Sequence, residues 1–445
     1  MNETRKRIPE LDGLRVLMIF IVSWYHIWQQ SWLRPVIGSY SLDYLVRSGY
    51  IGVDGTVLLS SFLLFLPYAR AMRDRLPAPD TRDFYFRRVR RILPGYYFII
   101  LVTLFVIAIP WGLYESPQFL VKDVATHLTF TFPFFRDTYV FTPLGAACWT
   151  LAIEVQAYLL FPWIAKGVMK KPALTLGVMG AVCFGFRAWC IWSLTDFSLV
   201  VNQLTNFLDV YVIGILAAML YTYMIGKQPM GEPMTTARGR SVVSGEVNRD
   251  RAEMDVTSPR QSRLRGYAWQ TVATLIFAAA FYILIRMLYI QAGSTVYTAD
   301  RGVAGWISRL LNMQPPASDY VVIQRNQMIY RPVYALCFTA MMLSAPFALW
   351  PLRKLLGNPV TKFLGGISMN YYLIHQTVIV HMKRIRFPAS VSDAPNTVGE
   401  QPWQNQYTFW AFALSLILAI LVTYLIEKPA ARLLNKWRLK KSSRA

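Results

Sequence analysis

Charged residues are scarce in this chain, and acidic ones most of all. Of its 445 residues 16% are charged, and 24 acidic side chains stand against 46 basic ones, a formal net charge of +22. A soluble domain carries about a quarter charged residues, so this composition argues against a soluble protein. The chain also has only 4 cysteines and no CxxC pair. We therefore expect no metal site, and we expect the cysteines to be small buried residues.

Long apolar segments recur along the whole chain. Hydrophobic residues make up 55% of the chain. A helix needs roughly 20 apolar residues to span the hydrocarbon core, and irregular backbone is not tolerated against lipid. The predicted fold is therefore all-α: a single polytopic membrane domain, residues 1–445, with about ten transmembrane helices. The predicted spans are residues 11–30, 51–69, 95–113, 144–165, 172–194, 205–225, 267–290, 328–349, 359–380 and 407–427.

The basic residues gather on one side of the predicted membrane domain. Counted from a cytoplasmic N-terminus, the even loops and the C-terminal tail hold most of them, whereas the odd loops are nearly balanced. Cytoplasmic loops typically carry such an excess of lysine and arginine. Both termini are therefore predicted to be cytoplasmic, in an integral multi-pass protein expected in the plasma membrane. Topology and contacts with membrane lipids account for the positive charge, so no nucleic-acid partner is expected.

Three segments bear on how the chain is organised. The first apolar run is too long for a signal peptide and has no small-residue cleavage site, so it is predicted to be the first span. Residues 227–265 contain no aromatic residue and no apolar period, which predicts a disordered cytoplasmic loop. The outer loops are aromatic, as in "FTFPFFRDTYVFTP" at residues 130–143. This composition suits either the membrane interface or the roof of a cavity.

The first predicted span, within "LDGLRVLMIFIVSWYH", contains an arginine and a histidine. Arg15 and His26 are eleven positions apart, so at 100° per residue they lie within about 20° of the same helix face and roughly 16 Å apart along the axis. In one interpretation Arg15 reaches the headgroups and His26 bonds a neighbouring helix. In the other, His26 is a base in a water-lined cavity, since histidine exchanges protons near neutral pH.

Three further ionisable residues lie inside predicted spans, where such groups are costly and often functional. Glu154 is near the middle of the fourth span, and a lone carboxylate in lipid is either protonated or paired. We predict that it orients His26 or binds substrate. Asp54, at the start of the second span, is either a helix cap or a functional residue. His375 lies in the outer half of the ninth span.

The run "FYFRRVRRILPGYY" is the densest positive feature of the chain. Arg87, Arg88, Arg90 and Arg91 are predicted to stand at the cytoplasmic mouth of the third span. One interpretation is topology combined with attraction to anionic lipid. The other is phosphate binding, because guanidinium groups form bidentate contacts with phosphate oxygens.

Together these segments resemble the acyltransferase-3 family of membrane proteins. The first span resembles a helix that reads roughly LDGLRaiAallVvlfH, and the arginine run resembles FyrRRilRilPpY. Four more segments match in the family's order: "GVDGTVLLSSFLL" is similar to GVDlFFvlSGFLi, "WTLAIEVQAYLLFP" to WSLsvEeqFYLlfP, "ISMNYYLIH" to SysiYLwH and "IEKPAARLL" to EkPfrr. The six matches extend over residues 11 to 433.

The resemblance implies an integral membrane O-acyltransferase. Its donor would be cytoplasmic acyl-CoA, with acetyl-CoA expected, and its acceptor a hydroxyl of a cell-surface glycan or a lipid-linked saccharide. The implied catalytic residues are Arg15, His26 and Glu154. The residues implied for donor binding are Arg87, Arg88 and Arg91. The residues assigned to substrate are Asp54, Ser60 and His375. Many members carry a C-terminal SGNH domain that this sequence lacks, so we expect direct transfer or a separate extracytoplasmic transferase partner.

The residues and the resemblance lead to one mechanistic hypothesis and one rival. In the hypothesis, CoA phosphates dock at Arg88 and Arg91, the thioester is threaded inward along the Arg15 face of the first helix, and His26 deprotonates the acceptor hydroxyl. The rival is a transporter or permease of a small polar or acylated solute, in which intramembrane charges are equally typical. No paired Gly/Pro-broken spans in matching halves support the rival.

Overall fold

The computed structural model describes residues 7–226, 266–294 and 319–442, so the loop predicted at 227–265 lies outside the described residues. The described part is almost entirely helical, as predicted. Its long helices are α1 (Glu10–Ser31), α3 (Ile51–Asp74), α4 (Thr81–Val102), α7 (Trp149–Lys170), α8 (Pro172–Ser193), α9 (Leu208–Ile225), α11 (Tyr267–Ser294), α13 (Asp319–Ser344), α15 (Pro359–Arg384) and α16 (Gln401–Val422).

Shorter elements connect the long helices. A two-stranded hairpin pairs Val36 with Ser41 and Ile37 with Tyr40. These elements are β1 (Val36–Ile37), β2 (Tyr40–Ser41), α2 (Asp43–Arg47), the π-helix η1 (Thr103–Ala108), α5 (Pro117–Leu128), η2 (Phe132–Phe134), α6 (Arg136–Val140), η3 (Ala146–Cys148), η4 (Leu204–Phe207), η6 (Ala345–Phe347), α14 (Trp350–Leu356), the π-helix η7 (Thr423–Glu427) and α17 (Lys428–Ser442).

The helices confirm a multi-pass membrane protein. Among the described residues, nine helical segments are long and apolar enough to cross a membrane. The ninth predicted span, residues 359–380, is present as α15, which is 26 residues long but does not reach the same apolar composition. Its polar side chains include Asn370 and His375, and both are fully buried inside the protein. The shortfall in hydropathy therefore reflects polar groups that face other helices rather than lipid.

Two predicted boundaries differ from the structure. The third span was predicted to begin at residue 95, but α4 begins at Thr81, so the arginine run is helical rather than part of a loop. The Asp80 side chain caps this helix by accepting hydrogen bonds from the backbone N–H groups of Arg82 and Asp83. At the other end of the chain, the basic tail forms α17, which continues the last span after the π-turn η7.

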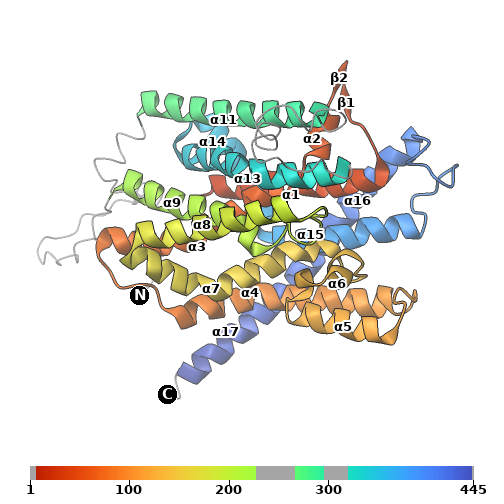
Figure 1. The fold of residues 1–445 in the computed structure, drawn as a ribbon, viewed down its shortest axis with the longest axis horizontal. Helices are drawn as coiled ribbons and strands as arrows, with labels where there is room; N and C mark the ends of the chain where they lie inside the picture. The colour runs from red at the N-terminus through yellow and green to blue at the C-terminus, as the bar shows by residue number, and fades with distance from the viewer. Residues whose placement is uncertain (1–6, 227–265, 295–318, 443–445) are drawn as a thin grey trace, which may run out of the picture.

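Five helices form a closed ring at the centre of the bundle. α1 packs against α3 and α15, α3 against α7, α7 against α4, and α4 against α15. The long helices run along a common direction in Figure 1, and α11 lies at the edge of the bundle. α3 is the most buried of the candidate spans, with 78% of its most apolar window inside the protein. The ring of α1, α3, α7, α4 and α15 encloses the site described below.

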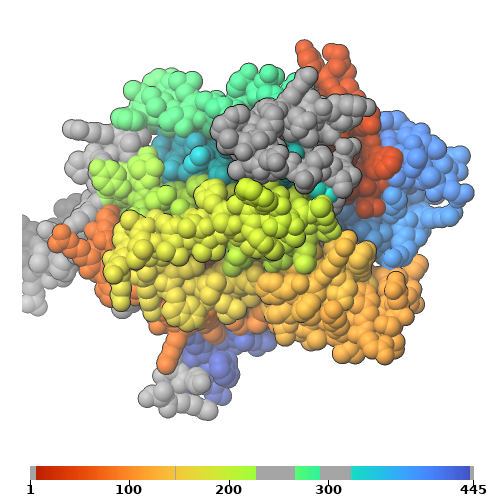
Figure 2. All heavy atoms as spheres, viewed as in Figure 1, coloured from red at the N-terminus to blue at the C-terminus, as the bar shows by residue number. Residues whose placement is uncertain are grey.

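The aromatic segment predicted as an interface or a roof folds at one end of the bundle. Figure 2 shows α5 and α6, in orange, as a compact mass beside the yellow helices, and η2 packs on α7. Phe132 is fully buried, whereas Phe134, Phe135 and Phe141 are exposed. Exposed aromatics at the end of a bundle suit the headgroup level of a membrane. The segment contributes nothing to the lining of the cavity at the centre of the ring.

Close helix packing explains one glycine of the first motif. A Cβ atom built on Gly13 would lie 2.3 Å from the carbonyl oxygen of Leu356, so α1 and α14 touch through their backbones at this point. Gly13→Ala is expected to lower the free energy of unfolding by about 1–3 kcal/mol, the usual cost of overpacking. The thermal unfolding of the detergent-purified protein measures this change.

Gly180 in α8 provides the matched control, because nothing lies within 4 Å of a Cβ atom built there. Gly180→Ala is expected to leave stability unchanged or slightly raised, since alanine has the higher helix propensity. A Gly13→Ala protein as stable as the wild type would contradict the close approach of α1 and α14.

Candidate active site

A cavity of about 630 Å³ lies inside the ring of five helices. Its lining includes Arg7 and Arg70, so the cavity reaches the end of the bundle that carries basic residues predicted to be cytoplasmic. Its walls combine apolar side chains, such as Leu59, Leu63 and Ile92, with charged ones. The charged lining residues are five arginines and three carboxylates: Arg7, Arg15, Arg70, Arg88, Arg91, Asp12, Glu154 and Glu427. The positive excess and the apolar walls suit an anionic ligand with an apolar part.

The helical period explains which arginines of the motif reach the cavity. Arg88 and Arg91 are three residues apart, so they lie on one face of α4, and both line the cavity. Arg87 pairs with Asp83 one turn earlier, and Arg90 donates to Asn435 of α17. Arg87, predicted to bind the donor, therefore lies beside the cavity rather than in its lining.

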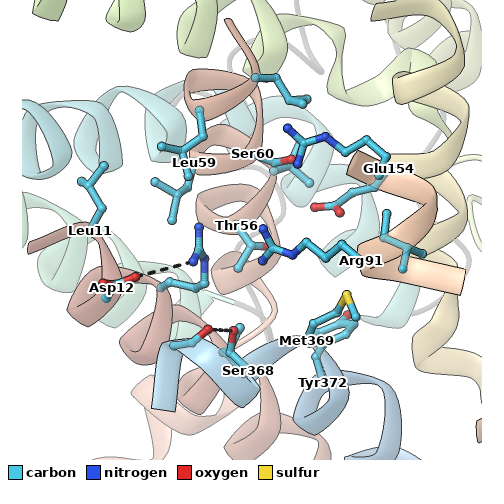
Figure 3. Close-up of a pocket in the computed structure, with 18 of the residues that line it drawn as sticks. Leu11, Asp12, Thr56, Leu59, Ser60, Arg91, Glu154, Ser368, Met369 and Tyr372 are labelled. Atoms are coloured by element: carbon cyan, nitrogen blue, oxygen red, sulfur yellow. Dashed lines mark hydrogen bonds and ion pairs between the residues drawn. The ribbon is translucent and has the colours of Figure 1, made fainter. Parts of the chain in front are cut away.

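Carboxylates hold the arginines and hydroxyls of the cavity in place. Asp12 accepts a hydrogen bond from Arg7 at 2.9 Å and forms an ion pair with Arg15 at 3.7 Å. On the opposite wall, the hydroxyl of Tyr158 donates to Glu154 at 2.7 Å and lies 3.4 Å from Ser60 Oγ. Figure 3 shows Glu154 and Arg91 reaching into the cavity from one side, with Asp12 on the other. The predicted residues Arg15, Ser60, Arg88, Arg91 and Glu154 therefore share one cavity.

The two intramembrane histidines form a pair outside this lining. The rings of His26 and His375 are 5.2 Å apart. The His26 Nδ1 atom lies 2.8 Å from the side-chain oxygen of Gln29, and His375 Nδ1 lies 2.6 Å from the carbonyl oxygen of Tyr372. Because these carbonyl oxygens only accept, both Nδ1 atoms carry a proton. In the neutral form of each imidazole, Nε2 then keeps a lone pair and can accept a proton.

The position of Glu154 differs from one prediction. Its carboxylate bonds Tyr158, and the imidazole of His26 is oriented by Gln29. Glu154 therefore does not orient His26 in this structure, and its other predicted role, binding substrate in the cavity, stays a prediction.

The cavity ends close to the histidine pair. On α1 its lining runs through Leu11, Arg15 and Ile19, and His26 is seven residues, or about 10 Å, further along the same helix. On α15 the lining includes Tyr372, whose ring also contacts His375 at a centroid distance of 5.3 Å. Tyr372 thus separates the arginine-lined cavity from the histidine pair.

Asp54 lies outside the cavity, in a buried ion pair. Arg331 of α13 donates to Asp54 at 2.8 Å and to the carbonyl oxygens of Val201 and Asn206 at 3.1 Å. Both charged side chains are about 3% exposed. The capping alternative is wrong: the N-cap of α3 is Tyr50, and Asp54 sits in the first turn with its side chain turned to Arg331.

Sequence reasoning missed three residues that shape the site. Asp12 and Glu427 line the cavity, and Arg331 neutralises Asp54 from 277 positions away. Asp12 lies in the first motif and Glu427 in the last, so these two motifs could have identified them as site residues. No local sequence pattern links Arg331 to α3, so Arg331 could not have been found in this way. All four cysteines are buried and unbridged, as predicted.

A comparison with known protein families identifies the family of this chain. The family model described as an acyltransferase domain, that of the acyltransferase-3 family, matches residues 8–428. The chain belongs to this family. This membership confirms the resemblance seen in the six motifs and favours an enzyme over a transporter.

Curated relatives of this chain include O-acetyltransferases. It is 26% identical over 200 residues to the peptidoglycan O-acetyltransferase OatA of Listeria monocytogenes, a match covering 40% of this chain and 29% of the relative. It is 29% identical over 193 residues to the putative peptidoglycan O-acetyltransferase YrhL of Bacillus subtilis, covering 40% of this chain and 27% of the relative. The O-acetyltransferase OatA of Staphylococcus aureus is 25% identical over 179 residues, or 37% of this chain and 26% of the relative.

These matches cover less than a third of the length of each relative. No solved structure matches the chain.

Proposed function

We propose that this acyltransferase moves an acetyl group from cytoplasmic acetyl-CoA to a hydroxyl of a cell-surface glycan, at the plasma membrane. The observation that carries the proposal is the convergence of Arg88 and Arg91 with Arg15 on one cavity of about 630 Å³. Guanidinium forks suit the phosphates of CoA, and the apolar walls suit its pantetheine arm. The names of the relatives, O-acetyltransferases of peptidoglycan, support the acetyl group and the glycan acceptor.

In the proposed reaction the histidine pair stands between donor and acceptor. The thioester enters from the arginine-lined cavity, and the Tyr372 side chain has to move aside for it to reach the histidine pair. His26 Nε2 takes the proton of the acceptor hydroxyl, whose oxygen attacks the thioester carbonyl. The carbon–sulfur bond then breaks, and the CoA thiolate takes up the proton from His26, which restores the base. His26 is half-buried near the outer end of α1, so the acceptor approaches from the side opposite to the donor.

The test of this proposal is acyl-CoA binding by the full-length purified protein. Arg88→Ala and Arg91→Ala are each expected to raise the Kd for acetyl-CoA by ~10- to 100-fold, because each removes hydrogen bonds between charged groups worth about 1.5–3 kcal/mol. Binding is measured by isothermal titration calorimetry in detergent or nanodiscs. The loss in affinity is expected to shrink at high salt, since phosphate contacts are screened.

Arg90→Ala provides the control within the same motif. Arg90 faces Asn435 of α17 and does not line the cavity, so this variant is expected to bind acetyl-CoA within about twofold of the wild type. A wild-type protein that binds no acyl-CoA, or an equal loss in all three variants, would refute the donor site.

Incubation of the purified protein with acetyl-CoA and a glycan acceptor tests the remaining steps. Acetylated glycan formed by this chain alone supports direct transfer. Acetyl-CoA hydrolysis or stalling that is relieved only by a second protein supports a separate extracytoplasmic transferase partner. Mass spectrometry of the glycan identifies the acyl group that is transferred.

A further inference from the structure

A buried amide joins the last motif of the chain to the cavity. The side-chain nitrogen of Asn370, which is fully buried in α15, donates to Glu427 Oε2 at 2.6 Å and to Thr423 Oγ1 at 2.8 Å. Both acceptors belong to the π-helical turn η7. A π-turn contains an extra residue, which rotates the following side chains by about 100° relative to an α-helix. This turn and the two hydrogen bonds together set the direction of the Glu427 side chain.

The neighbouring helix leaves Asn370 no room to move. A Cβ atom on Gly95 of α4 would lie 2.4 Å from the Asn370 side-chain oxygen, so this oxygen presses against the backbone of α4. α4 is the helix that carries Arg88 and Arg91. The contact between Gly95 and Asn370 therefore fixes the position of α4 relative to α15 and η7. Gly95 lies four residues after Arg91 on the same helix.

Glu427 lines the cavity and interacts electrostatically with Arg91. Arg91 and Arg15 are close enough to repel each other, and Arg15 already has Asp12 as its partner. Without a counter-charge, repulsion by Arg15 would drive the Arg91 guanidinium away from the centre of the cavity. Glu427 supplies that counter-charge on the α4 side. Because Asn370 occupies one carboxylate oxygen, Glu427 itself is fixed.

We infer that Glu427, held by Asn370, is a positioning residue for the donor: it keeps Arg91 directed into the cavity, where the guanidinium meets a phosphate group of acyl-CoA. The inference rests on the proposed function, since it assigns a role within the same donor site. Glu427 touches neither the thioester nor the acceptor, so its removal weakens donor binding and leaves the chemical step nearly unchanged. The opposite role, a carboxylate that competes with phosphate for Arg91, predicts tighter donor binding when Glu427 is neutralised.

The experiment measures acyl-CoA affinity and turnover in the full-length protein. Glu427→Gln keeps the shape and an acceptor for Asn370 but removes the charge. It is expected to raise the Kd and KM for acetyl-CoA about tenfold, with kcat within about twofold of the wild type. Glu427→Asp is expected to recover part of the loss. Asn370→Ala, which leaves Glu427 charged but unheld, is expected to act in the same direction with a smaller effect.

A double-mutant cycle shows whether Glu427 acts through Arg91. The losses from Glu427→Gln and Arg91→Ala are expected to be non-additive, because the carboxylate has nothing to position once the guanidinium is gone. The losses from Glu427→Gln and Arg88→Ala are expected to add, since Arg88 lies against the rings of Phe84 and Tyr158. Glu400→Gln, in an outer loop where Glu400 accepts from backbone amides, is the charge-loss control and should leave binding unchanged.

The outcomes separate this inference from the proposed function. Wild-type protein that binds acetyl-CoA, with Glu427→Gln equal to it or tighter, overturns the positioning role and leaves the donor site intact. Additive losses with Arg91→Ala overturn it as well. Wild-type protein that binds no acyl-CoA overturns both. If Glu427→Gln does not fold, Glu427→Asp and Asn370→Ala decide, because wild-type affinity in both would refute the inference.

Discussion

His26→Ala is expected to slow acetyl transfer by ~10²–10⁴-fold while leaving the affinity for acetyl-CoA unchanged. The hydrogen bond to Gln29 places the proton of His26 on Nδ1 and leaves the lone pair of Nε2 to act as base. His26 does not line the arginine-lined cavity, so its loss removes the acceptor's base without disturbing the phosphate contacts. Single-turnover transfer and acetyl-CoA binding, measured on the same preparation, separate the two effects.

Variants of two other histidines, His375 and His381, serve as comparisons for His26→Ala. His375, at 5.2 Å from His26, is predicted to bind substrate, so His375→Ala is expected to raise the KM for the acceptor more than it lowers kcat. His381 lies one to two turns further along α15, against the ring of Trp111. His381→Ala is expected to retain transfer within about twofold. A well-folded His26→Ala protein with normal turnover would exclude His26 as the base.

Arg331→Met is expected to destabilise the protein by about 3–5 kcal/mol, the cost of leaving one member of a buried ion pair unpaired. Arg331 is almost completely buried, bonds Asp54 and two backbone carbonyls, and lies 3.8 Å over the ring of Phe207. Its removal leaves the Asp54 carboxyl group buried in the membrane domain without its partner. Thermal unfolding, or unfolding by SDS in mixed micelles, measures the loss.

Two comparisons make the stability result interpretable. The double variant Asp54→Asn with Arg331→Met is expected to be more stable than Arg331→Met alone, because no unpaired charge remains. Arg386 pairs with Asp393 on the surface, where their side chains are 76% and 90% exposed, respectively. Arg386→Ala should therefore change the free energy of unfolding by less than about 1 kcal/mol. Equal effects at Arg331 and Arg386 would contradict the buried pair.

The same variants decide between structure and substrate for Asp54. Asp54→Asn in a folded protein that keeps normal transfer would leave Asp54 with a structural role alone. A folded Asp54→Asn protein whose acceptor KM rises would support the predicted substrate contact, since the pair with Arg331 would then serve to hold the carboxylate for the acceptor. The KM for the acceptor is the quantity that separates the two results.

Motifs and local periodicity predicted several parts of the site. The family resemblance singled out Arg88 and Arg91, and the structure puts both in the cavity lining. The helical period placed Arg15 and His26 on one face of α1, yet only Arg15 lines the cavity. Between them Ile19 ends the lining on α1, and Tyr372 of α15 closes the space beside the histidines. Such a closure depends on how two helices pack, which the pattern of one helix does not contain.

Glu154 was predicted to orient His26 or to bind substrate, whereas the structure gives Glu154 to Tyr158 and His26 to Gln29, each a partner three or four residues away on the same helix. Other partners come from distant segments, which no local pattern reaches. Arg331 neutralises Asp54 across the bundle, and Asn370 holds Glu427 across two helices. A charge in lipid requires a partner, but which helix supplies it follows from the order of helices around the ring.

The sequence by itself determined that this chain is a multi-pass membrane protein and which motifs it carries, because the length of an apolar run and the spacing of residues along one helix are local properties. The tertiary structure decided which polar side chains share a cavity, where that cavity ends and which charges neutralise one another. These depend on which helix faces lie together inside the ring, and the free energy that selects the arrangement is summed over contacts between segments hundreds of residues apart.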